Sequence, residues 1–128
     1  MSRRYMVGVG AVPGVSEAEL RVLVEGALAE AGVAVEEVRA LATLDRRAGE
    51  PAIARLALLR GWELLGFSAA ALAKITVPSP SERVREATGT ASVAEAAALA
   101  AAHGGELVVG KKRSAGATVA VARVCGTF

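Results

Sequence analysis

The chain has 128 residues, 53% of them apolar, and its 15 basic and 13 acidic side chains leave a formal charge of +2. This length suits one compact unit with its own core, so we predict a single domain over residues 1–128. The balanced charge and an aromatic content of 3% argue against a nucleic-acid partner, which needs a basic surface and rings that stack on bases.

Apolar periodicity and helix-capping residues predict strands and helices that alternate in the first half of the chain. In chain order, the expected elements are a strand over residues 4–12, a helix between Ser16 and Gly32, a strand over 38–44, a helix over 51–60, a short strand over 62–67, a short helix over 68–75, an extended loop over 77–81, a short helix over 81–87, an alanine-rich helix from Ser92 to about His103, and a hairpin of strands over 106–110 and 117–124. This order predicts an α/β fold, a three-layer α/β/α sandwich around a mixed, mainly parallel sheet of about five strands.

A glycine-rich turn joins the first expected strand to the first expected helix. Gly8, Gly10 and Gly14 stand there, and the free N–H groups at a helix start favour an anion. The turn resembles a dinucleotide fingerprint only in part, because the third glycine falls one place late and Pro13 occupies its position. An anion or carboxylate site, a plain tight turn and a dinucleotide site are therefore all open for this segment.

Polar residues also gather after the second expected strand. Thr43, Asp45, Arg46 and Glu50 lie near its carboxyl end, where α/β sheets usually place their ligands. The alternative is structural, with Asp45 capping a turn and the arginines solvated.

Near the C-terminus, residues 111–116 read as a basic hairpin loop that opens with Lys111. Such a loop suits carboxylates or phosphates, and it equally suits a soluble hairpin tip that discourages edge pairing.

The sequence gives little support for a metal site, a catalytic nucleophile or a membrane segment. His103 is the single histidine and is expected to cap a helix end, while Cys125 is the single cysteine. We therefore predict no metal site, no cofactor and no catalytic triad. The lone cysteine, the lack of a signal-peptide pattern and the lack of a long apolar window predict a cytoplasmic protein that does not engage a membrane.

Several blocks, taken in order, resemble the CobE family, which includes the C-terminal domain of CbiG proteins. These blocks are the Gly-x-Gly-x-x-x-Gly-x-Ser turn over residues 8–16, Ala42-Thr43-Leu44-Asp45 followed by Glu50, Phe67-Ser68, Val77-Pro78-Ser79-Pro80-Ser81, the run from Thr88 to Ala96, and Lys111 before Ala117-Thr118-Val119-Ala120. The resemblance extends over nearly the whole chain. It implies a role in building the corrin ring of cobalamin.

The resemblance also implies a ligand and a set of site residues. The ligand is a ring-contracted precorrin or related corrinoid, and other enzymes of the cobalamin pathway are possible partners. The expected ligand-binding residues are Gly8, Gly10, Gly14, Ser16, Thr43, Arg46, Thr88, Gly89, Ser92, Glu95 and Lys111. Longer CbiG proteins open the lactone of cobalt-precorrin-5A with release of acetaldehyde, and in that reading Asp45 or Glu50 is the general base. This chain matches only their C-terminal domain, so we expect binding, with lactone hydrolysis as the alternative.

Overall fold

The computed structural model describes residues 3–75, 93–103 and 105–124. The expected loop over residues 77–81, the helix over 81–87 and Cys125 lie outside these ranges. The described residues form one five-stranded sheet of β1 (Tyr5–Ala11), β2 (Val38–Leu44), β3 (Glu63–Phe67), β4 (Glu106–Arg113) and β5 (Ala117–Arg123), in the order β3-β2-β1-β5-β4.

Four strands run in one direction and one runs against them. β1 is parallel to β2, and β2 is parallel to β3, whereas β5 is antiparallel to both β1 and β4. This pattern confirms the predicted mixed, mainly parallel sheet. A hairpin at the end of the chain produces it, because a short connection can only return antiparallel.

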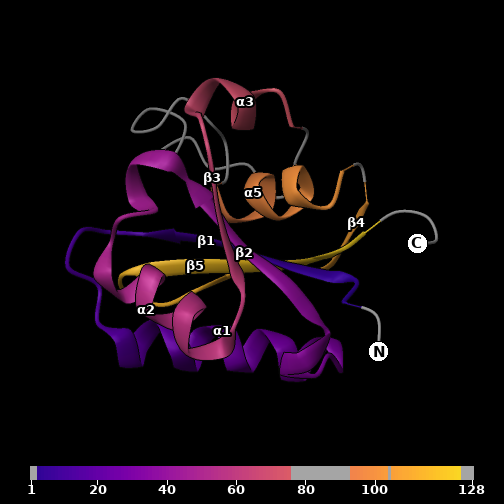
Figure 1. Ribbon diagram of the computed structural model, residues 1–128, viewed down its shortest axis with the longest axis horizontal. Coiled ribbons are helices and arrows are strands. Elements are labelled where there is room, and N and C mark those ends of the chain that lie inside the picture. The colour runs from indigo at the N-terminus through magenta and orange to yellow at the C-terminus, as the bar shows by residue number, and fades with distance from the viewer. Residues whose placement is uncertain (1–2, 76–92, 104, 125–128) are drawn as a thin grey trace.

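Helices cover both faces of the sheet, as the three-layer prediction requires. In Figure 1, α1 (Glu17–Ala31) and α2 (Pro51–Arg60) lie below the sheet, while α3 (Ala69–Ala73) and α5 (Val93–Ala101) lie above it. Two short 3-10 helices, η1 (Val35–Glu37) and η2 (Asp45–Arg47), flank β2. Two cores result, one on each face.

The two cores differ in the size of their side chains. The α1 face is filled by valine, leucine and isoleucine, with Trp62 donating a hydrogen bond from its indole N–H to the Val35 carbonyl at 3.2 Å. The α5 face is filled largely by alanine from the helix and from the strands beneath it. Small side chains on both surfaces let α5 approach the sheet closely.

Gly8 marks the closest approach. A Cβ built on Gly8 would lie 2.0 Å from the Ala94 carbonyl oxygen and 2.6 Å from the Ala98 nitrogen. Gly8 therefore faces α5 and not the open edge of the sheet where we expected a ligand. Helix packing explains why this position is a glycine.

The predicted ends of the first two helices are correct. Ser16 caps α1 by accepting the Glu19 N–H at 3.0 Å, and Gly32 ends the helix in the left-handed conformation with a φ of 70°. Gly61 ends α2 in the same way. In a full capping box the Glu19 side chain would also accept the Ser16 N–H. Among the described residues this second bond is not formed, because the Glu19 carboxylate turns to the β4–β5 hairpin.

The prediction of a basic loop over residues 111–116 is wrong. β4 continues through Arg113, so the loop is only Ser114 to Gly116 and the cations belong to an edge strand. Their polarity resembled that of a loop because an edge strand exposes many of its side chains. Lys112, for example, pairs with Glu30 on α1.

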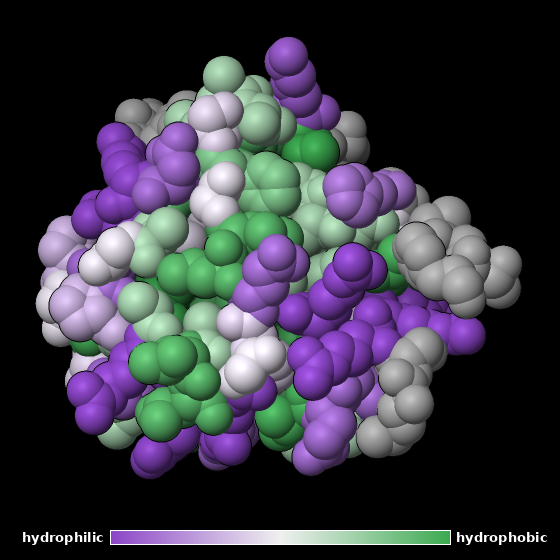
Figure 2. Space-filling model, in the orientation of Figure 1, coloured by the Kyte–Doolittle hydropathy of each residue, from purple (hydrophilic) through white to green (hydrophobic). Residues whose placement is uncertain are grey.

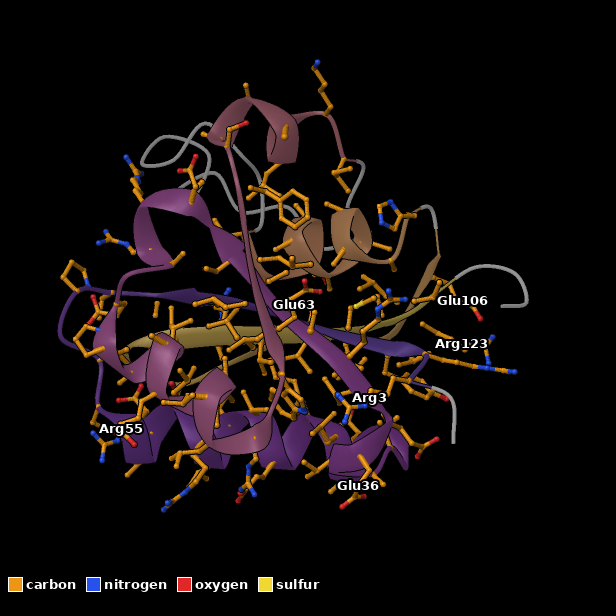
Figure 3. All side chains as sticks on the ribbon, viewed as in Figure 1. Arg3, Glu36, Arg55, Glu63, Glu106 and Arg123 are labelled. Carbon is orange, nitrogen blue, oxygen red and sulfur yellow. The ribbon has the colours of Figure 1, made fainter. Side chains whose placement is uncertain are left out.

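The two edges of the sheet differ in character. β4 carries two register shifts and three cations, and its first residue, Glu106, pairs with Arg123 opposite it on β5 (Figure 3). β3 is short and apolar. Figure 2 shows apolar surface on its side of the molecule and over α2, where Leu58 and Leu59 are exposed.

Every helix among the described residues is too short or too polar to span a membrane.

Candidate functional site

Polar residues and helix starts gather at one edge of the sheet. β1, β2, β3 and β4 all end there and β5 begins there, since β4 and β1 both run against β5. α5 also starts at this edge, because its first residue Val93 lies over Gly10 while Ala98 lies over Gly8. We call this border the carboxyl edge. It is where open α/β sheets bind ligands.

A row of three residues crosses this edge on the α5 face. Arg113 on β4 is opposite Thr118 on β5, and Thr118 is opposite Gly10 on β1. A Cβ on Gly10 would lie 2.8 Å from the Thr118 hydroxyl and 3.4 Å from the Val93 Cβ, which places the row beside the first turn of α5. We call these residues the Arg113 row.

The Arg113 row joins a cation, a hydroxyl and the positive end of a helix dipole. Arg113 is exposed and forms no ion pair with the other described residues, whereas Thr118 is half-buried. The Thr118 hydroxyl lies 3.5 Å from the Gly10 carbonyl oxygen, a long contact that leaves it able to turn to another partner. Such donors suit a carboxylate.

Sequence patterns missed Thr118, and they included Arg113 only as one cation of the expected basic loop, with Lys111 as the named ligand-binding residue. The register of the β4–β5 hairpin would have revealed that Arg113 and Thr118 are neighbours, but this register depends on the residue at which the loop begins. With the loop placed at residues 111–116, Arg113 had no partner on β5. Gly10 is the one member of the row that was expected individually as a ligand-binding residue.

Thr43 lies at the same edge but is committed to the fold. Its side chain is fully buried, and its hydroxyl donates to the Val9 carbonyl at 2.7 Å. The paired residues of β1 and β2 end at Gly8 and Ala42, so this bond continues the link between the strands where they separate. The Thr43 donor is therefore already used within the protein.

Glu50 occupies the glycine turn. Its Oε1 atom accepts the Gly14 N–H at 3.0 Å, across 36 residues of sequence. The turn before α1 thus binds a carboxylate, as its N–H groups predict, but the carboxylate is the protein's own. This contact argues against the dinucleotide alternative, because the pyrophosphate of such a ligand would compete for the same turn.

Glu19 anchors the hairpin loop to the start of α1. It accepts a hydrogen bond from the Ser114 hydroxyl and the Gly116 N–H, the latter at 2.6 Å. The Ser114 bond and, after it, the Gly116 bond lower the pKa of the Glu19 carboxyl below its ordinary value of 4.5. No local sequence pattern indicates this role for Glu19, because Ser114 is 95 residues away along the chain.

Asp45 and Arg46 follow β2 in η2 and are both exposed. Close packing holds this turn against β3, since a Cβ on Gly66 would lie 3.1 Å from the Asp45 Cα. Ser16 lies on the α1 face of the sheet, where its hydroxyl caps α1. The carboxyl edge therefore brings Gly10, Asp45 and Arg46 to one border of the sheet.

Glu95 and Lys111 meet between α5 and β4. The Glu95 side chain is fully buried, and its Oε2 atom accepts the Lys111 backbone N–H at 2.9 Å. The other expected residues of this block, Thr88, Gly89 and Ser92, lie outside the described residues. Within the described ranges, no group of three or more His, Cys, Asp or Glu residues is arranged to hold a metal ion.

Comparison with known proteins connects this chain and its fold to one pathway. A family model described as "Cobalamin synthesis G C-terminus" matches residues 5–122. Protein CobE from Sinorhizobium sp is 41% identical over 120 residues, which cover 91% of this chain and 78% of CobE. A crystal structure of CobE, described as a protein from the cobalamin (vitamin B12) biosynthetic pathway, superposes with a TM-score of 0.89 at 35% identity, covering 96% of this chain and 95% of that one.

A longer relative carries an enzymatic name. The cobalt-precorrin-5A hydrolase of Priestia megaterium is 32% identical over 118 residues, which cover 92% of this chain but only 32% of the hydrolase. The family model and the CobE matches, in contrast, extend over most of the compared length. The chain therefore belongs to the family of CobE and the CbiG C-terminal domain, and it is a protein of cobalamin biosynthesis.

Proposed function

We propose that this protein binds a ring-contracted precorrin or related corrinoid intermediate at the carboxyl edge of its sheet, on the α5 face. The observation that carries the proposal is the Arg113 row, which sets a guanidinium, a hydroxyl and a helix start side by side. Corrin precursors carry acetate and propionate carboxylates around a flat apolar ring. A binder of such a ring needs several carboxylate donors beside an apolar surface.

Each member of the row has a part in this proposal. Arg113 donates two parallel hydrogen bonds to one ligand carboxylate, a geometry that the planar guanidinium favours. Thr118 donates a hydroxyl to the same or a neighbouring carboxylate. Val93 packs beside Gly10 and is only 8% exposed, so the row borders the apolar core of the α5 face. In this proposal Arg46, which is exposed in η2 after β2, meets a carboxylate on another side of the ring.

A spectral titration tests the proposal. Hydrogenobyrinic acid is added to the protein and to an Arg113→Met variant. We expect the variant to bind ten- to a hundredfold more weakly, because a hydrogen bond to a charged group contributes about 1.5–3 kcal/mol.

The matched control is Arg39→Met, which removes the same charge from an exposed position at the amino end of β2. We expect Arg39→Met to bind like the unchanged protein. Equal weakening in both variants would assign the effect to net charge, and an unchanged spectrum with the parent protein would refute the binding proposal.

Lactone hydrolysis is the second candidate, and the likeness to cobalt-precorrin-5A hydrolase favours it. In this reading Asp45, exposed at the end of β2, is the general base that takes a proton from water. The measurement is acetaldehyde release from the lactone-bearing intermediate. Asp45→Asn should abolish release while Glu36→Gln, a change on the exposed η1, should not. Full release by the Asp45→Asn protein would remove Asp45 from the mechanism.

A further inference from the structure

One carboxylate is buried in a helix whose other buried residues, apart from Val93, are alanine. Glu95 has no exposed surface, and its neighbours in α5 at the same depth are Ala94, Ala96, Ala97 and Ala98. Burying a carboxylate costs free energy that only hydrogen bonds or an opposite charge offset. Because burial of the Glu95 carboxylate is costly, we look for a role of this side chain other than packing.

The carboxylate reaches an irregular point of β4. Val109 is opposite Val121 and Lys112 is opposite Val119, so three steps along β4 match two steps along β5. The extra residue is a β-bulge, and it disrupts the ladder at Gly110 and Lys111. The Glu95 Oε2 atom accepts the Lys111 N–H at 2.9 Å, and it lies 3.4 Å from where a Cβ on Gly110 would stand.

The bulge decides which face of the sheet receives Arg113. Residues 109 and 113 are four apart and would share a face in a regular strand, since side chains alternate with a period of two. Val109 instead packs in the core beneath α1, whereas Arg113 lies beside Thr118 on the α5 face. Lys112, between them, pairs with Glu30 on α1, as this shifted alternation requires.

We propose that Glu95 is a positioning residue: by accepting the Lys111 N–H it holds the bulge that turns Arg113 toward the ligand. This inference rests on the proposed binding of corrinoid carboxylates by the Arg113 row. It replaces the expectation that Glu95 itself touches the ligand. Glu95 acts through the backbone of β4, so its effect on affinity should exist only while the Arg113 guanidinium is present.

A double-mutant cycle measures this dependence, with hydrogenobyrinic acid as the probe and each variant titrated below its melting transition. We expect Glu95→Ala to weaken binding about tenfold in the parent protein and not at all in the Arg113→Met background. Glu95→Gln keeps an acceptor oxygen at the same reach and should rescue most of the affinity. A purely structural role would lower the melting temperature of Glu95→Ala without changing the dissociation constant of the folded protein.

Glu95→Asp serves if Glu95→Ala does not fold. It keeps the charge but withdraws the carboxylate by one methylene, so binding should weaken severalfold while Glu95→Gln stays near the parent value. The inference is overturned if Glu95→Asp and Glu95→Gln both bind like the parent, or if the loss persists undiminished in the Arg113→Met background. If the parent protein itself leaves the probe spectrum unchanged, the binding proposal fails and this inference fails with it.

Discussion

A single methyl group on Gly8 should separate α5 from the sheet. The Cβ of a Gly8→Ala protein would lie 2.0 Å from the Ala94 carbonyl oxygen and 2.9 Å from the Ala98 Cβ. An ordinary contact begins at 3.4 Å, so relief of the first clash needs a displacement of 3.4 − 2.0 = 1.4 Å. The oxygen belongs to helix backbone, which no side-chain rotation can move away.

The cost follows from this displacement. Overpacking a core costs 1–3 kcal/mol and sometimes more, and we place Gly8→Ala at about 3 kcal/mol because the whole helix must shift. Shifting it also opens a gap along the alanine contacts, which lose part of their dispersion energy. For a chain of this length the melting temperature should fall by about 10 °C, measured by circular dichroism with urea unfolding as a second probe.

Gly26→Ala is the matched control. Gly26 is exposed within α1, and a Cβ there meets nothing within 4 Å. The same substitution should therefore stabilise the protein by about 0.5–1 kcal/mol, since alanine is the better helix former. A Gly8→Ala protein as stable as the parent would show that α5 does not pack so closely on β1.

Three further changes test other parts of the structure. His103 has a φ of 51°, in the left-handed region that strains a residue with a side chain. His103→Gly should therefore raise the free energy of unfolding by about 1 kcal/mol, and an unchanged urea midpoint would show that His103 is not strained. Thr43→Val leaves the Val9 carbonyl without its donor and should cost about 1–3 kcal/mol, with Thr43→Ser close to the parent; equal losses would contradict the hydrogen bond. The lowered pKa of Glu19 contributes stability that is present above pH 4.5 and is lost as pH falls through its folded value; Glu19→Gln should flatten that acid limb, and an identical pH profile would contradict the Ser114 contact.

Local sequence signals predicted the elements whose ends depend on local chemistry. Ser16 and Gly32 define α1 because one side chain caps the start and one left-handed residue ends the helix. Gly61 ends α2 in the same left-handed conformation. The layer architecture followed, since strands and helices that alternate produce a parallel sheet with both faces covered.

The candidate site was harder to predict because its members meet through register. Arg113, Thr118 and Gly10 become neighbours only after two strand pairings are known, and the bulge in β4 shifts one of them. Thr43 and Glu50 sit near the expected edge, but the hydrogen bonds that commit them to Val9 and Gly14 span 34 and 36 residues. No periodic pattern within a short window carries such information.

The alanine layer under α5 makes this face of the protein sensitive to substitutions that add side-chain volume. Most of its buried side chains are a single methyl group, so only a change to glycine removes volume. Nearly every other substitution adds atoms where the backbone is already in contact. Random mutation on the α1 face, filled with leucine and valine, mainly opens cavities, whereas on the α5 face it mainly forces the layers apart. Mutations therefore destabilise the two faces of the sheet for opposite reasons, by loss of side-chain volume on the α1 face and by excess volume on the α5 face.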